Sequence, residues 1–291
     1  MQKKIHALIR LIRPKQWVKN IFVFTGVLFG EVHRMEETLL LALLAALSFC
    51  LISSAVYTFN DLIDKEQDKR HPKKKLRPLA SGEVTNSEAA LLIAALTTLS
   101  FTIGSIVSSL TLTLLVSYAF INILYTLYLK NVVILDVFCI ASGFMLRILA
   151  GTAGIGIPPS KWLLLCGMMI TLFLGFTKRK AEILQLKSAM REHRKVLMSY
   201  DSIFLDELIG ITAASVIIAY SLYTMNDETI RIHHTENLIY TVPFVVFALF
   251  RYLYLINSKQ SGGDPTNDLI SDKQIMASVG LFTLLTFYLV H

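Results

Sequence analysis

Long apolar runs alternate with short polar stretches along the whole chain. The runs are long enough to cross a hydrocarbon core of about 30 Å as helices, at about 1.5 Å per residue. Helices are expected because each one satisfies its own backbone hydrogen bonds in lipid. The pattern predicts nine spans, near residues 17–33, 39–59, 88–108, 111–129, 132–156, 161–177, 203–225, 238–257 and 275–290. Only Lys130 and Asn131 separate the fourth span from the fifth.

Composition supports a membrane protein. Hydrophobic residues make up 54% of the 291 residues, and charged residues only 17%, against about 25% in soluble domains. We therefore predict one all-α, polytopic membrane domain covering residues 1–291. We expect no cleaved signal peptide, because no small-residue cleavage site follows the first apolar run. Residues 3–19 are predicted instead to form a basic amphipathic stretch on the membrane surface.

The distribution of Lys and Arg predicts the orientation. Of the 28 Lys and Arg residues, 23 fall on the side of the N-terminus and the two longest loops, and three on the other side. The basic side is expected to be cytoplasmic. The net charge of +7 then reflects topology and contact with anionic lipids. A nucleic-acid partner is not expected, since the bases lie close to the spans. A homo-oligomer is compatible with the pattern, which does not specify one.

The loops at residues 60–87 and 178–202 carry most of the candidate chemistry. The first begins with Asn60 and continues with Asp61, Asp64 and Asp68. On a continuing helix these aspartates stand at i, i+3 and i+7, within about 60° of one face. Such close carboxylates repel one another unless a cation lies between them, and oxygen ligands alone favour Mg²⁺ or Mn²⁺. The alternative is a solvated helix end with i,i+4 ion pairs.

A basic stretch follows these aspartates directly. Pro72 and Pro78 prevent a simple helix there. Arg70, Lys73 and Arg77 are therefore candidate phosphate donors, and the arginines suit bidentate contacts. A lysine in this stretch could equally be a topology charge near the lipid headgroups.

Residues 60–68, together with Arg77-Pro78-Leu79-Ala80-Ser81-Gly82, resemble the first aspartate-rich motif of the UbiA superfamily of intramembrane prenyltransferases. Nine helices around a central cavity and two long cytoplasmic loops are also that family's plan. The resemblance therefore covers essentially the whole chain. It implies Mg²⁺ held by Asp61, Asp64 and Asp68, with Asn60 beside them.

Three further stretches resemble one branch of the superfamily, which joins phosphoribosyl pyrophosphate (PRPP) to a polyprenyl phosphate. They are residues 13–20, residues 135–147 with Asp136 and Arg147, and residues 178–182. The second loop lacks the clear second aspartate motif of many members, which favours a sugar donor over a prenyl donor. The substrate-binding candidates are Lys178, Arg179, Glu182, Tyr200 and Asp206 in the second loop, and Lys15, Trp17 and Lys19 for the lipid phosphate.

Asp136 and Arg147 are the two ionisable residues of the fifth predicted span that share a helix face. Charges inside a membrane usually face a cavity or a partner. Asp136 is predicted to border the site, whereas Arg147 either lines the cavity or joins helices structurally. Two other functions stay open: prenyl transfer from a prenyl diphosphate to an aromatic acceptor, and transport. A transporter gives no reason for three aligned carboxylates beside a basic loop.

Overall fold

The computed structural model describes residues 2–32, 34–72, 74–186, 199–259 and 271–290, and this part of the chain is helical without strands. It contains eight stretches long and apolar enough to cross a membrane. They are built on α3 (Met35–Ile63), α5 (Asn86–Val107), α6 (Ser109–Leu127), α7 (Leu135–Ala150), α8 (Lys161–Leu186), α9 (Ser202–Thr224), α11 (Val242–Lys259) and α13 (Lys273–Val290). The predicted all-α polytopic fold is confirmed, whereas the count of nine spans is not.

The first predicted span accounts for the difference. Residues 17–33 fall on a 3₁₀ helix, η1 (Pro14–Phe24), and a short α-helix, α2 (Thr25–Phe29), instead of one long helix. The fifth predicted span is interrupted too, because α7 ends before Gly151 and the chain continues as η4 (Ala153–Ile155). Both interruptions lie where two backbones touch. A Cβ on Gly151 would stand 1.6 Å from the carbonyl oxygen of Val23, so only glycine permits this approach.

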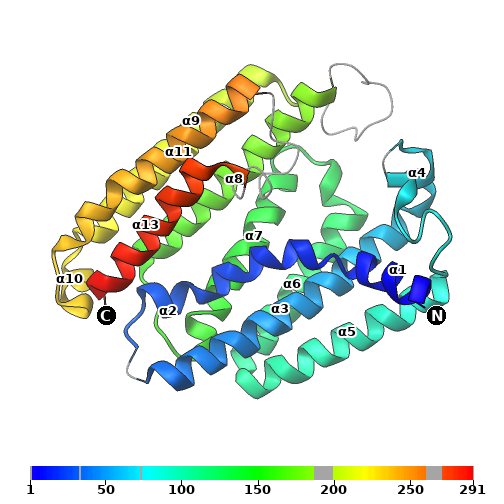
Figure 1. Cartoon of the computed structure of the whole chain (residues 1–291), viewed down its shortest axis with the longest axis horizontal. Helices are drawn as coiled ribbons and strands as arrows, with labels where there is room; N and C mark the ends of the chain where they lie inside the picture. The colour runs from blue at the N-terminus through cyan, green and yellow to red at the C-terminus, as the bar shows by residue number, and fades with distance from the viewer. Residues whose placement is uncertain (1, 33, 73, 187–198, 260–270, 291) are drawn as a thin grey trace. The chain divides into compact units, whose positions relative to one another are not determined.

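The chain divides into two compact units. The first comprises residues 1–27, 32–129 and 146–157. Its central helix is α3, which packs against α5, α6 and η1, and α3 and α5 run side by side (Figure 1). Its core includes Val23, Phe49, Ile52, Leu115 and Ala150.

A second apolar cluster of this unit ties the N-terminus to the first loop. The amphipathic helix α1 (Gln2–Ile12) buries Ala7 and Leu11 against Leu79, Val84 and Ala89. Between α3 and α5 the loop forms the short helices α4 (Lys65–Arg70) and η2 (Lys74–Leu76). The start of α5 is closed by a capping box between Thr85 and Glu88, which satisfies backbone N–H groups at the helix end.

The second unit comprises residues 28–31, 130–145 and 158–291. Helices α8 and α9 pack along each other, as do α11 and α13. The shorter elements η3 (Leu129–Asn131), α10 (Asp227–His233) and η6 (Asn237–Thr241) join the long helices. Val137 of α7 packs on Gly175 of α8, where an added Cβ would lie 2.5 Å from the valine Cγ1. The core also contains Phe173, Leu205 and Tyr252.

Candidate functional site

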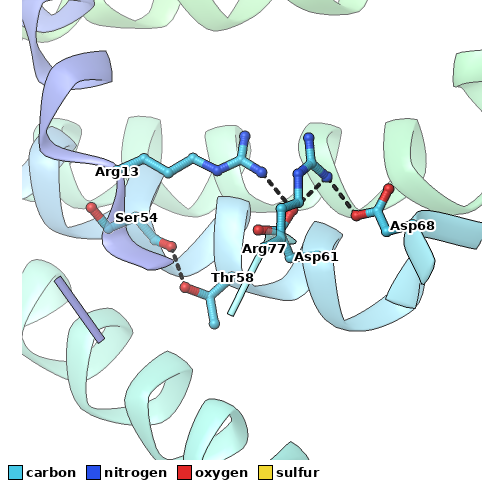
Figure 2. Close-up of polar contacts among 6 residues, drawn as sticks. All are labelled: Arg13, Ser54, Thr58, Asp61, Asp68 and Arg77. Carbon is cyan, nitrogen blue, oxygen red and sulfur yellow. Dashed lines mark hydrogen bonds and ion pairs between the residues drawn. The ribbon is translucent and has the colours of Figure 1, made fainter. Parts of the chain in front are cut away.

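Two aspartates and two arginines meet near the C-terminal end of α3 in the first unit (Figure 2). Arg77 donates through Nη1 to Asp61 Oδ1 at 2.9 Å and to Asp68 Oδ2 at 2.6 Å. Arg13 donates through Nη2 to the same Asp61 oxygen at 2.5 Å. Asp61 and Asp68 are 2% and 3% exposed. We call Arg13, Asp61, Asp68 and Arg77 the aspartate–arginine cluster.

Local helix geometry brings the two aspartates together. The α3 helix ends at Ile63, but the backbone bonds from Asp64 N–H to Asn60 and from Asp68 N–H to Asp64 keep the chain close to helical. Positions i and i+7 therefore stay on one face, as the spacing predicts. Arg77 reaches the same face because the loop folds back through η2.

Arg13 arrives from a sharp turn at the end of α1. Its backbone lies in the left-handed region, with φ 53°, directly before Pro14. Its guanidinium also stands over the ring of Tyr57 at 5.4 Å. Below it, Ser54 Oγ donates to the carbonyl of Ile12 at 2.9 Å, and Trp17 Nε1 donates to Ser54 Oγ at 3.0 Å. These contacts hold the N-terminal segment on α3.

The oxygen groups at this site fit a hard divalent cation in their chemistry. The amide oxygen of Asn60 is buried and has no hydrogen-bond partner among the described residues, and it precedes Asp61 directly. Buried orphan acceptors are rare and call for an explanation. No three His, Cys, Asp or Glu side chains in the described ranges are grouped around one point. Instead, arginine guanidiniums lie on the carboxylates of Asp61 and Asp68, and Asp64 is half-buried.

The remaining candidates of the first unit have mixed positions. Arg70 and Lys15 are exposed, and Trp17 and Lys19 are half-buried. Lys73 lies outside the described residues. The structure therefore brings Arg77 into the cluster, while Arg70 is not part of it.

Arg147 is buried in the first unit, 4% exposed. It donates through Nε to Asn20 Oδ1 at 2.7 Å and through Nη2 to the hydroxyl of Tyr118 at 3.1 Å. Its guanidinium also lies over the rings of Tyr118 and Phe49, at 4.7 and 5.5 Å. These contacts join η1, α3 and α6, so they favour the structural role for Arg147.

The second unit contains a separate buried network centred on Asp136, in the first turn of α7. Arg179 Nε donates to Asp136 Oδ2 at 2.6 Å, and both side chains are 0% exposed. Arg179 Nη1 also binds Glu182 Oε2 at 2.5 Å. The Tyr200 hydroxyl donates to Asp136 Oδ1 at 2.7 Å and accepts from the N–H of Ile134 at 2.7 Å. We call Asp136, Arg179, Glu182 and Tyr200 the Asp136 network.

This network keeps Tyr200 neutral. Burial, followed by the hydrogen bond to Asp136, raises the pKa of Tyr200 above its ordinary value. Next to the network, Lys180 pairs with Asp206 and donates to Asn257 Oδ1 at 2.6 Å. Lys178 is half-buried, and residues 187–198 of the second loop lie outside the described residues.

Sequence reasoning did not select Arg13, Lys180 or Asn257. Arg13 contacts a residue 48 positions away, and Lys180 one that is 77 positions away. No local spacing signals contacts at such separations. Arg13 and Lys180 do lie in the stretches 13–20 and 178–182 that resemble the family, and the proline directly after Arg13 indicates a turn there.

Comparison with known proteins places the chain in a family. The family model described as "UbiA prenyltransferase family" matches residues 20–266. A decaprenyl-phosphate phosphoribosyltransferase of Corynebacterium glutamicum is 31% identical over 288 residues, covering 96% of this chain and 85% of that protein. A protein of the same name from Mycobacterium tuberculosis is 28% identical, with coverages of 96% and 93%. The structure of a UbiA homologue from Archaeoglobus fulgidus bound to DMAPP and Mg²⁺ has a TM-score of 0.73 at 19% identity, with coverages of 97% and 98%. The chain belongs to the UbiA prenyltransferase family.

Proposed function

We propose that this protein transfers 5-phosphoribose from PRPP to a polyprenyl phosphate and releases pyrophosphate. Two relatives named for transfer of phosphoribose to decaprenyl phosphate support this, because the similarity extends along nearly the whole of each chain. The observation that carries the proposal is the aspartate–arginine cluster, which offers buried carboxylates for a cation and guanidiniums for phosphates in one place.

The donor substrate is assigned to the first loop. Bound Mg²⁺, or Mn²⁺, held by Asn60, Asp61, Asp64 and Asp68, would neutralise the charge that develops on the departing pyrophosphate. Arg77 binds phosphate oxygens as a forked donor, with Arg70 and Lys73 as further phosphate contacts from the same loop.

The acceptor needs no strong general base. A lipid phosphate oxygen is already anionic, so it attacks the anomeric carbon directly as the carbon–pyrophosphate bond breaks. Catalysis is then mainly positioning and electrostatic stabilisation. We assign the lipid phosphate to Lys15, Trp17 and Lys19, whose segment is held on α3.

The second loop is assigned to substrate binding as well. Lys178 and Asp206 are proposed to contact substrate groups. Arg179 and Asp136 are wholly buried and bind each other, so we assign them to positioning. Asp136 and Arg179 orient the buried Tyr200 and the partly exposed Glu182.

The protein is proposed to act in the cytoplasmic membrane of a bacterium, with both long loops on the cytoplasmic side. Substrates would then reach it from two phases, PRPP from the cytosol and polyprenyl phosphate from the bilayer. The polyprenyl tail stays among apolar helices, where its transfer into water is avoided.

An assay with purified protein in detergent distinguishes the candidate functions. It uses radiolabelled PRPP, a polyprenyl phosphate and Mg²⁺, and follows the label into the organic phase. A parallel reaction contains a prenyl diphosphate and 4-hydroxybenzoate. Label entering the lipid from PRPP supports the proposal. Product in the parallel reaction alone identifies a prenyltransferase, and product in neither reaction with folded protein removes both enzymatic assignments.

A further inference from the structure

The aspartate–arginine cluster is balanced in charge. It contains two carboxylates and two guanidiniums, and each carboxylate is in direct contact with a guanidinium. The carboxylate side chains are 3% and 4% exposed, and the two arginine side chains 28% and 29%. The acids are therefore buried, while both guanidiniums remain partly open to an incoming group.

This charge balance opposes the binding of a divalent cation alone and of a diphosphate alone. A divalent cation that takes Asp61 must displace two guanidiniums that already donate to the same oxygen. A free diphosphate that takes the guanidiniums leaves two buried carboxylates without partners. Breaking a buried ion pair from one side is costly, because it leaves an uncompensated charge.

The two ions together remove both costs. When a cation occupies the carboxylates, the released guanidiniums find phosphate oxygens, which accept their forked donors well. Every charge then has a partner again. Arg13 is central to this exchange, because it contacts only Asp61 among the acids of the cluster and its side chain extends from the turn between α1 and Pro14.

Helix α1 keeps Arg13 within reach of both positions. Lys4 pairs with Glu88 at 2.7 Å, and Arg10 pairs with Glu83. The buried side chains of Ala7 and Leu11 fix the same helix to the first loop. The guanidinium of Arg13 can therefore change partner without a movement of α1.

We propose that Arg13 is a phosphate-binding residue and that Arg13 and Arg77 make cation binding and diphosphate binding mutually dependent. Both arginines exchange carboxylate oxygens for phosphate oxygens when a divalent cation takes Asp61 and Asp68. This inference rests on the proposed function only in taking a metal–diphosphate as the ligand. Because coupling is reciprocal, pyrophosphate raises the affinity for the cation by the same factor as the cation raises the affinity for pyrophosphate.

Equilibrium dialysis of the full-length protein in detergent measures this coupling without turnover. Radioactive Mn²⁺ and inorganic pyrophosphate are added singly and together. Free ions and their soluble chelate equalise across the membrane, so the excess on the protein side reports binding alone. For the wild type we expect each ion to bind roughly 10- to 100-fold more tightly in the presence of the other, the factor that one charge-assisted hydrogen bond supplies.

Arg13→Gln tests the exchange itself, and Arg10→Gln is its matched control. Both remove one positive charge from the same segment, but Arg10 pairs with exposed Glu83 and not with Asp61. We expect Arg13→Gln to bind Mn²⁺ alone roughly tenfold more tightly than the wild type, because Asp61 loses one competing cation. Its affinity for pyrophosphate with Mn²⁺ present should fall by a similar factor. Arg10→Gln should match the wild type in both measurements.

Two results overturn the inference: wild-type affinities that are the same for the ions alone and together, or equal Mn²⁺ affinity in the two variants. Should Arg13→Gln not fold, Arg13→Lys replaces it, with loss of forked phosphate binding as the expected effect. The proposed function is tested separately. Coupling without transfer from PRPP leaves this inference standing with another diphosphate, and transfer without coupling removes this inference alone.

Discussion

Replacing Asp136 by Asn tests whether the Asp136 network stabilises the second unit. The carboxylate accepts one hydrogen bond from Arg179 and one from Tyr200, at 2.6 and 2.7 Å. Asparagine has only one acceptor oxygen, so its amide N–H groups must face one of these donors. Arg179 also loses its buried counter-charge. Breaking such a pair from one side costs about 3–5 kcal/mol.

Glu182 moderates this cost. It remains on the Arg179 guanidinium at 2.5 Å, although it is 24% exposed. We therefore expect a loss near the lower end, about 3 kcal/mol. In a protein of this size such a loss corresponds to a fall in Tm on the order of 10 °C.

Thermal unfolding in detergent, followed by far-UV circular dichroism, measures the effect. Asp272→Asn is the matched control, because Asp272 pairs with Arg251 at 2.9 Å near the surface of the same unit. Asparagine retains the helix-capping oxygen at that position, so we expect a loss of at most about 1 kcal/mol. Equal shifts for the two variants would refute a special role for the buried network.

Three further predictions concern other parts of the chain. Asp61→Asn should lower transfer activity at least roughly 100-fold, whereas Glu66→Gln, on an exposed acid of α4, should leave the rate unchanged in the same assay. Gly151→Ala should lower Tm by several degrees, because its Cβ would lie 1.6 Å from a backbone oxygen; Gly210→Ala, with open space around it, should not lower it. The pKa of Tyr200 is raised in the folded protein, so its contribution to stability is fully present below about pH 10, the pKa of tyrosine in an unfolded chain. This contribution disappears as pH rises through the folded pKa. The fall in Tm at alkaline pH should therefore be smaller in Tyr200→Phe than in the wild type.

The membrane helices were predictable because their signal is local. An apolar run of sufficient length can satisfy its backbone only as a helix in lipid, and eight predicted spans correspond to candidate spans of the structure. The first predicted span is not among these eight, because its residues fall on η1 and α2. Its apolar composition is suitable, but backbone contact between Gly26 and Gly151 depends on a segment 125 positions away, which no window of sequence contains.

The candidate site likewise combines contacts that local spacing predicts with contacts between residues far apart in the sequence. Helical spacing predicts that Asp61 and Asp68 share a face, and both contact Arg77 in the structure. The spacing says nothing about Arg13, whose contact depends on the docking of α1 and on a left-handed turn. In the structure the Arg77 side chain contacts both aspartates, and the metal ion expected between them stays a prediction. Positive charge was predictable from electrostatic repulsion, but its source was not.

The transfer assay with radiolabelled PRPP, polyprenyl phosphate and Mg²⁺ tests the central claim most directly. The account predicts that the label moves into the lipid phase, that chelation of the metal stops it, and that Asp61→Asn abolishes it in protein that remains folded. Folded wild-type protein that leaves all of the label in the aqueous phase, while converting a prenyl diphosphate and an aromatic acceptor to product, would contradict the account.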